Sequence, residues 1–277
     1  MKTVLITGCS SGIGAATAAR LQKSGWDVWA SARRPETLAD LAAAGCRTVA
    51  LDVNDEESMT SAVRAVLAES GRIDALVNNA GYSQSGALES VDVDDVRRQF
   101  ETNVFGLIRL TQLVLPEMRE QGSGRIVNIG SMGGKLTFPG GGAYHASKYA
   151  VEALSDALRF EVAGFGIKVV LVEPGLITTE FDAKVEAGME GLTEEGPYAR
   201  FNAAVLKATK EAYAGPMAKL GGPPESVAKV IEKALTKKSP KPRYTVTPSA
   251  SASIATRRLM TDRMWDMAMK AQFPQPR

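Results

Sequence analysis

Short apolar segments rich in valine and isoleucine alternate with longer amphipathic segments from the start of the chain to about residue 175. A short run that is apolar at nearly every position is typical of a strand buried on both faces, whereas the longer segments repeat their apolar residues with the period of a helix. Regular alternation of the two predicts a parallel, doubly wound α/β sheet. The expected strands are residues 4–6, 28–30, 48–51, 75–77, 125–129 and 168–172, and the expected helices are residues 13–23, 56–68, 93–118 and 143–163.

The pattern changes after residue 175. Residues 176–222 are of mixed character and contain several glycines, and we interpret them as a lid inserted over the carboxyl ends of the strands, where open α/β sheets bind ligands. A helix over 224–237 and a last strand over 243–246 are expected to complete the sheet, and residues 250–277 form a C-terminal extension. Because no repeat or low-complexity linker interrupts the chain, residues 1–277 are expected to form one domain.

Composition excludes several classes of protein. The formal net charge of +2 and the interspersed acidic and basic residues give no sign of nucleic-acid binding. The two cysteines, Cys9 and Cys46, lack the spacing of a metal site or of a disulfide framework, which fits the reducing cytoplasm. Strand-like sequence begins directly after Met1 and no apolar run is long enough to span a bilayer, so we expect neither a signal peptide nor an integral membrane segment.

Three glycines, Gly8, Gly12 and Gly14, lie between the first expected strand and the first expected helix. Glycine allows a tight turn and a close approach of the backbone to a ligand, and the free N–H groups at a helix start favour a pyrophosphate. The spacing is G-x-x-x-G-x-G and differs from the common G-x-G-x-x-G dinucleotide pattern. The turn therefore predicts dinucleotide binding, with a glycine-rich turn that binds no ligand as the alternative.

Tyr144 and Lys148 are four residues apart in a segment that is expected to be helical, so their side chains leave the same helix face. A tyrosine, with a reference pKa of about 10, transfers protons poorly near neutral pH unless a nearby cation favours its phenolate. Lys148 is a candidate for that cation, although such pairs also occur on solvated helix faces. His145 is the only histidine and points about 100° away from Tyr144, so we interpret it as structural.

The order of these motifs resembles a known family. Besides the three glycines and the Tyr144–Lys148 pair, the chain has Asn78-Asn79-Ala80-Gly81 after the fourth strand, Ser131 after the fifth and Pro174-Gly175 at the end of the sixth. Over essentially its whole length the chain resembles the classical short-chain dehydrogenase/reductases. The resemblance implies a Rossmann-type fold, interconversion of an alcohol and a ketone with a nicotinamide dinucleotide, and a homodimer or homotetramer.

The resemblance also implies catalytic roles. Tyr144 is expected to act as the general acid in reduction and the general base in oxidation, and Lys148 to favour the phenolate and bind the nicotinamide ribose. Ser131 is expected to hold the substrate oxygen, and Asn103 to kink its helix and hold a water near Lys148. A single histidine and two separated cysteines lack the ligands of a zinc-dependent alcohol dehydrogenase, so we expect no metal in the site.

The end of the second strand indicates the cofactor. Ala32 stands where NAD-binding relatives carry an acid for the ribose hydroxyls, and Arg33 and Arg34 follow, so NADP is favoured over NAD, with a solvated arginine pair as the alternative. Asp52 is expected beside the adenine. The resemblance implies further cofactor contacts from Ser10, Ser11, Ile13, Val53, Asn79, Ala80, Gly81, Pro174, Gly175, Ile177 and Thr179.

Within the family the motifs look most like the branch that contains 17β-hydroxysteroid and retinol dehydrogenases. The resemblance and the apolar content of the lid together favour a bulky apolar ketone or alcohol, with a steroid as the preferred example. Other hypotheses are a non-catalytic dinucleotide-binding regulator, a reductase of small or acyl-linked carbonyls, and an epimerase or dehydratase. Residues 261–273 are expected to pack on their own subunit, with a helix over the pocket, a subunit contact or a weak membrane anchor as alternatives. The expected pocket residues are Met132, Leu136, Phe138, Phe181, Met189, Leu192, Tyr198 and Phe201.

Overall fold

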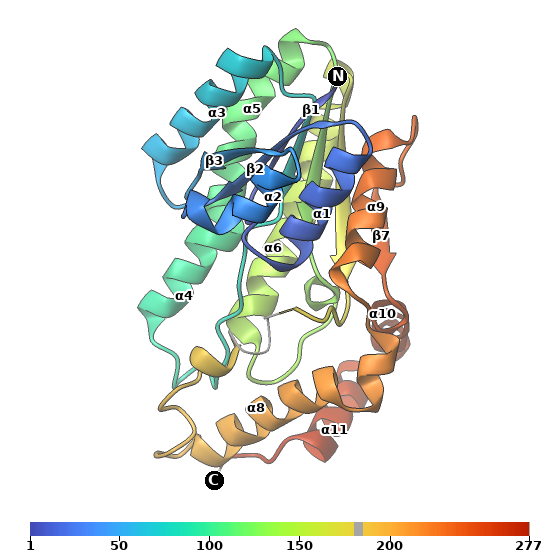
Figure 1. Ribbon diagram of the computed structural model, residues 1–277. Helices are drawn as coiled ribbons and strands as arrows, with labels where there is room; N and C mark the ends of the chain where they lie inside the picture. Colours follow the sequence, from blue (N-terminus) through green and yellow to red (C-terminus); the bar gives the residue numbers. More distant parts are fainter. Residues whose placement is uncertain (180–184, 277) are drawn as a thin grey trace.

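The computed structural model describes residues 1–179 and 185–276, and it confirms the doubly wound sheet (Figure 1). Seven parallel strands lie in the order β3-β2-β1-β4-β5-β6-β7, which is a Rossmann-type arrangement. Each expected strand is present, with ends that differ by at most two residues. The strands are β1 Thr3–Ile6, β2 Asp27–Ala32, β3 Arg47–Ala50, β4 Ala75–Asn78, β5 Gly124–Ile129, β6 Ile167–Pro174 and β7 Arg243–Val246.

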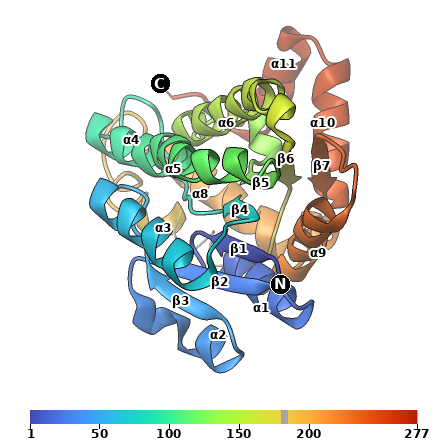
Figure 2. The same ribbon diagram turned by 90° about the horizontal axis from the view of Figure 1, so that it is seen from above.

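Helices cover both faces of the sheet (Figure 2). Successive strand residues point to opposite faces, so Val4 and Ile6 pack under the helices of one face while Leu5 packs under those of the other. All three side chains are fully buried. The helices on the first face are α1 Gly12–Lys23, α2 Ala39–Ala43 and α9 Pro224–Thr236, and those on the second are α3 Glu56–Ser70, α5 Gly106–Glu120 and α6 Gly142–Glu161.

The helix expected over 93–118 is one continuous helical run with a change of pitch inside it. The α4 helix, Val93–Phe100, leads through a π-helical turn, Glu101–Phe105, into α5. Such turns distort the regular hydrogen-bond ladder and often lie at functional sites. Asn103 occupies the middle of this turn and is almost completely buried.

Three more helices gather beyond the carboxyl ends of the strands (Figure 1): α8 Ala199–Ala214, α10 Pro248–Leu259 and α11 Asp262–Gln272. Met269 and Phe273, from α11 and the residue that follows it, share a buried apolar cluster with Val205 of α8. The C-terminal extension therefore packs on its own chain. Among the described residues no helix has the length and apolar character needed to cross a membrane.

Candidate active site

The turn between β1 and α1 brings three backbone segments together. Gly8 and Gly12 have φ angles of 70° and 58°, a region that L side chains rarely adopt. A Cβ on Gly8 would lie 3.0 Å from the Cα of Ala80, and a Cβ on Gly14 only 2.2 Å from the carbonyl oxygen of Gly8. The side-chain amide of Asn79 stabilises the turn by donating to the carbonyl oxygens of Thr7 (2.9 Å) and Gly8 (3.1 Å).

The N-terminus of α1 is open to an anionic ligand. Ser11 occupies the N-cap position, yet its side chain makes no capping hydrogen bond within the described part of the chain, and the first turn contains no acidic residue. The free N–H groups and the helix dipole favour negative charge there. Ser10, Ser11, Gly12 and Ile13 line the same cavity as the catalytic candidates, so the turn fits a dinucleotide pyrophosphate.

Replacing Gly14 with alanine tests this close packing. The new methyl group must displace the Gly8 carbonyl or tilt α1, which we expect to destabilise the fold by about 1–3 kcal/mol and to lower dinucleotide affinity about tenfold or more. Calorimetric titration and thermal unfolding measure both effects. Gly164→Ala is the matched control, because apart from its chain neighbours no residue has an atom within 4 Å of the added Cβ. Equal affinities for the two variants would contradict the assignment of this turn.

A cavity of about 1790 Å³ runs across the carboxyl ends of the strands. It brings together three of the four catalytic candidates, Ser131, Tyr144 and Lys148. Among the described residues that were expected to touch the cofactor, Gly14 and Arg34 do not line it; Gly14 lies behind the turn, against the carbonyl oxygen of Gly8. The expected cofactor residues that do line it are Gly8, Ser10, Ser11, Gly12, Ile13, Arg33, Asp52, Val53, Asn79, Ala80, Gly81, Tyr144, Lys148, Pro174, Gly175, Ile177 and Thr179.

The end of the cavity near Arg33 has a second arginine that was not expected from the sequence. Arg98, on α4, lines this end together with Arg33 and Asp52, and it is paired with Asp95. Burial raises the pKa of Tyr82, and the charges of Arg98 and Arg33 oppose that rise, so both arginines lie near this phenol. No sequence signal marks Arg98, because its place at the cavity depends on the tertiary packing of α4, which contacts α6.

Ser131 and Tyr144 both line the cavity and contact each other. Ser131 is the last residue before the 3₁₀ turn Met132–Gly134, and its hydroxyl accepts a hydrogen bond from the N–H of Gly133 (3.0 Å). The same side chain is hydrogen-bonded to the phenol of Tyr144. Burial raises the pKa of Tyr144, and the bond to Ser131 partly offsets this rise, so the phenol keeps its proton near neutral pH.

Lys148 lies one helical turn after Tyr144. Its Nζ is 5.8 Å from the centroid of the Tyr144 ring and donates to the carbonyl oxygen of Ile129 (2.9 Å). Burial lowers the pKa of Lys148 to about 8. A Cβ on Gly81 would lie 3.7 Å from this Nζ, so the missing side chain of Gly81 leaves room beside the ammonium. The lysine thus stands next to the phenol while its hydrogen bond runs to the backbone.

Asn103 does not line the cavity in the described structure, and its side chain braces the wall from behind. Its Oδ1 accepts from the N–H of Tyr82 (3.0 Å), and its Nδ2 donates to the carbonyl oxygen of Tyr82 (2.9 Å) and to Oγ of Ser147 (3.0 Å). These bonds join the segment after β4 to α6. The kink that was expected at Asn103 coincides with the π-helical turn Glu101–Phe105, and the same residue braces the cavity wall.

Several expected pocket residues lie elsewhere. Leu136 is fully buried in the core, Met189 and Phe201 belong to the apolar cluster under α11, and the hydroxyl of Tyr198 donates to Glu89 at the surface. Leu192 does not line the cavity among the described residues, and Phe181 lies outside them. Met132 and Phe138 do line the cavity, with Val185, Val205, Ala208, Thr209, Glu211, Ala212, Tyr213, Pro216, Met217, Leu220, Ser249, Ala252, Ser253, Thr256, Met260, Trp265, Ala268, Met269, Gln272 and Phe273.

This difference has a physical reason. Residues 176–222 have no single period, so the sequence does not indicate which side chains point inward. The α10 helix was not expected at all, because its alternating serines and alanines give no apolar stripe. The described part of the chain contains no group of three or more His, Cys, Asp or Glu side chains that could hold a metal ion.

The parallel sheet, the dinucleotide-type turn and the serine, tyrosine and lysine on one wall define an α/β oxidoreductase. Comparison with known proteins identifies the family within this class. The family model for short chain dehydrogenases matches residues 2–190. The chain belongs to the short-chain dehydrogenase/reductase family.

Relatives of similar length are oxidoreductases. YbbO, an uncharacterized oxidoreductase of Escherichia coli (strain K12), is 38% identical over 272 residues, which make up 97% of this chain and 94% of that protein. An NADPH-dependent 3-dehydrocapnine reductase of Ornithobacterium rhinotracheale is 34% identical over 275 residues, 96% of this chain and 95% of that protein. The crystal structure of a short-chain dehydrogenase from Streptomyces avermitilis aligns with a TM-score of 0.80 at 38% identity, over 98% of this chain and 97% of that one.

Proposed function

We propose that this oxidoreductase uses NADP(H) to interconvert a secondary alcohol and a ketone, and that its substrate is bulky and apolar. The observation that carries the proposal is the single cavity that joins the hydrogen-bonded Ser131–Tyr144 pair and Lys148 to an uncapped helix N-terminus and to Arg33. Arg33 directly follows β2, and an arginine near this position accommodates the 2′-phosphate in NADP-dependent folds of this type, which supports the choice of NADP. A relative with a nearly full-length match carries NADPH dependence in its name, which supports the same choice.

The dinucleotide, when bound, supplies or accepts the hydride. The protein's own side chains bind the substrate oxygen and exchange a proton with it. Ser131 donates a hydrogen bond that orients the carbonyl, and Tyr144 transfers its proton to the oxygen as negative charge develops there. The ammonium of Lys148, next to the phenol, stabilises the phenolate that remains. Because burial keeps Tyr144 protonated, the arrangement suits a proton donor in the direction of ketone reduction.

The size and charge of the cavity support a bulky apolar substrate. Small-molecule sites usually measure about 300–1,000 Å³, so a cavity of about 1790 Å³ accommodates a dinucleotide and a second large molecule. Among the described lining residues of α8, α10, α11 and the 3₁₀ turn Pro216–Leu220, Glu211 is the one charged side chain. Because no cation lines this part of the cavity among the described residues, the phosphate of an acyl carrier or another anion would be buried there without an opposite charge, which is unfavourable. Steroids and retinoids are the substrate classes that we favour.

A panel of ketones tests the substrate class. We expect the highest kcat/KM for steroid, retinoid and aromatic ketones and the lowest for short aliphatic ketones and sugars, because each buried methylene contributes about 0.8 kcal/mol to binding. The measurement is the fall in NADPH absorbance with each substrate. Equal or better turnover of small polar sugars or of acyl-linked ketones would overturn the substrate assignment. Absence of turnover with every ketone and alcohol would instead favour a non-catalytic dinucleotide-binding protein.

A further inference from the structure

The loop that follows β5 forms a wall of the substrate end of the cavity. Residues 131–141 begin with Ser131, contribute Met132 and Phe138 to the lining, and end at Gly141 just before α6. Its position therefore decides where Ser131 stands relative to Tyr144 and how much room the substrate has. Three side chains from outside the loop hold it in place, two from α6 and one from α11.

His145, next to Tyr144 on α6, holds the loop at two points. Its Nε2 accepts from the N–H of Phe138 (3.1 Å), and its Nδ1 lies 2.9 Å from the carbonyl oxygen of Gly133. Since the Phe138 N–H is a donor, Nε2 must be unprotonated, and Nδ1 must carry the proton that is donated to Gly133. Only the neutral imidazole satisfies both contacts, because an imidazolium presents N–H groups at both positions.

The loop is closely fitted to the imidazole. A Cβ on Gly133 would lie 2.7 Å from Nδ1, and a Cβ on Gly141 would lie 2.8 Å from the far side of the ring. Either glycine would have to move if it carried a side chain, so the loop closes around His145 at both of its ends. The ring of Phe138 lies 6.0 Å from the imidazole by centroid distance.

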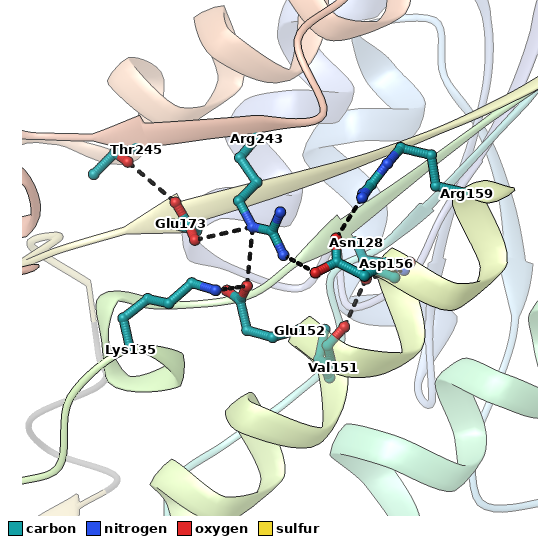
Figure 3. A network of polar contacts seen from close by, with 10 residues as sticks. Asn128, Lys135, Val151, Glu152, Asp156, Arg159, Glu173, Arg243 and Thr245 are labelled. Atoms are coloured by element: carbon teal, nitrogen blue, oxygen red, sulfur yellow. Dashed lines mark hydrogen bonds and ion pairs between the residues drawn. The ribbon is translucent and has the colours of Figure 1, made fainter.

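The other two anchors act on neighbouring residues of the loop. The indole N–H of Trp265, on α11, donates to the carbonyl oxygen of Thr137 (3.1 Å), and its ring lies 5.8 Å from that of Phe138. At the start of the loop, Lys135 contacts Glu152 of α6 (2.5 Å). Figure 3 shows Glu152 held in turn by Arg243 of β7, whose Nε lies 3.1 Å from the same carboxylate oxygen. These anchors hold the loop independently of the His145 side chain.

We propose that His145 is a positioning residue for ketone reduction, which sets the loop that carries Ser131 and Phe138 and does so only as the neutral imidazole. This inference rests on the proposed function for its kinetic consequences, while the contact itself is independent of any activity. His145 touches the loop backbone, so its effect on the substrate acts through Ser131 and Phe138. The sole histidine thereby acquires a role that its place beside Tyr144 in the sequence does not reveal.

Electrostatics around the ring agree with this role. Burial lowers the pKa of His145, and the bond to Gly133 opposes this only in part. The charged or titratable groups of the elements packed around it are engaged elsewhere: Lys135 with Glu152, Lys148 with the Ile129 carbonyl, and Arg257 with Asp262 and the ring of Trp265. Tyr144 meets the imidazole edge-on, with 5.7 Å between ring centroids. No carboxylate among the described residues is bonded to the imidazole to stabilise its charged form.

Two amide variants separate the contacts. In His145→Gln the side-chain oxygen reaches the position of Nε2 and can still accept from Phe138, whereas in His145→Asn the shorter amide reaches only the position of Nδ1 and Gly133. We expect His145→Asn to raise KM for a bulky ketone about tenfold, because the Phe138 N–H loses its acceptor. His145→Gln is expected to stay within about twofold of wild type in KM, and both variants should keep kcat within a few-fold.

The pH profile supplies a readout that a merely structural role would not change. Wild-type kcat/KM should fall at low pH, below the usual histidine value of about 6.5, as the imidazole gains a proton and repels the Phe138 N–H. The side chain of His145→Gln cannot titrate, so this fall of kcat/KM at low pH, the acid limb of the profile, should disappear. Glu161→Gln, exposed at the far end of α6, is the matched control and should retain the limb. Retention of the limb in His145→Gln would overturn the proposal.

Amide hydrogen exchange tests the contact without turnover. The Phe138 amide should exchange about tenfold faster in His145→Asn than in wild type or in His145→Gln. Equal protection in all three proteins would overturn the proposal even if no substrate is known. Conversely, if wild type reduces no ketone while the exchange pattern is as expected, the proposed function fails and the positioning contact stands. If His145→Asn does not fold, His145→Gln and the pH profile still decide the matter.

Discussion

Replacing Tyr144 with phenylalanine is expected to lower kcat for ketone reduction about 10²-fold or more, with nearly unchanged affinity for NADPH. The phenyl ring keeps the shape of the cavity wall, and the only group removed is the hydroxyl that is hydrogen-bonded to Ser131. Without this hydroxyl the substrate oxygen loses the proton donor that is bonded to Ser131. Steady-state assays at the NADPH absorbance band and calorimetric titration of the cofactor measure the two quantities separately.

Tyr149→Phe provides the matched control. Tyr149 lies on the same helix, is 44% exposed and does not line the cavity among the described residues, so the same chemical change should leave kcat unaltered. Near wild-type turnover in Tyr144→Phe would show that the proton reaches the substrate by another route. A loss of NADPH affinity as large as the loss of turnover would show that the phenol acts mainly in binding.

The sheet could be predicted from the sequence because its strands are buried on both faces. Val4, Leu5 and Ile6 are all fully buried, and a run that is apolar at every position carries that information directly. The positions of the catalytic residues could be predicted because Ser131 follows closely after the end of β5 and Tyr144 and Lys148 share one face of α6. The local geometry of each element therefore indicates where these side chains point.

The substrate end could not be predicted in the same way. Tyr198 and Phe201 were expected in the pocket, yet one bonds to Glu89 and the other packs beneath α11, since side-chain direction in this region depends on tertiary packing. Trp265, in contrast, was not expected in the pocket but lines it. It comes from the C-terminal extension, and its indole is hydrogen-bonded to a loop 128 residues earlier in the chain. Contacts at such separation leave no local pattern in the sequence.

The cofactor preference should be reversible by two substitutions at the end of β2. Ala32 and Arg33 both line the cavity, so Ala32→Asp places an acceptor for a free ribose hydroxyl while Arg33→Ser removes a cation. A lost charge-assisted contact to the 2′-phosphate weakens NADP binding by about 1.5–3 kcal/mol and leaves NAD almost untouched. The added acid repels the phosphate as well, so the double variant is expected to prefer NAD.

Arg34→Ser and Arg98→Ser show which cations meet the phosphate. Among the described residues Arg33 lines the cavity and Arg34 does not, so the loss of Arg34 should weaken NADP binding less than the loss of Arg33. Arg98 lines the same end as Arg33, and its charge remains in Arg33→Ser, which reduces the effect of that single change. Calorimetric titration of NADP and NAD against each variant gives the order. If wild type binds NAD as tightly as NADP, the arginines at this strand end are solvated and do not select the cofactor.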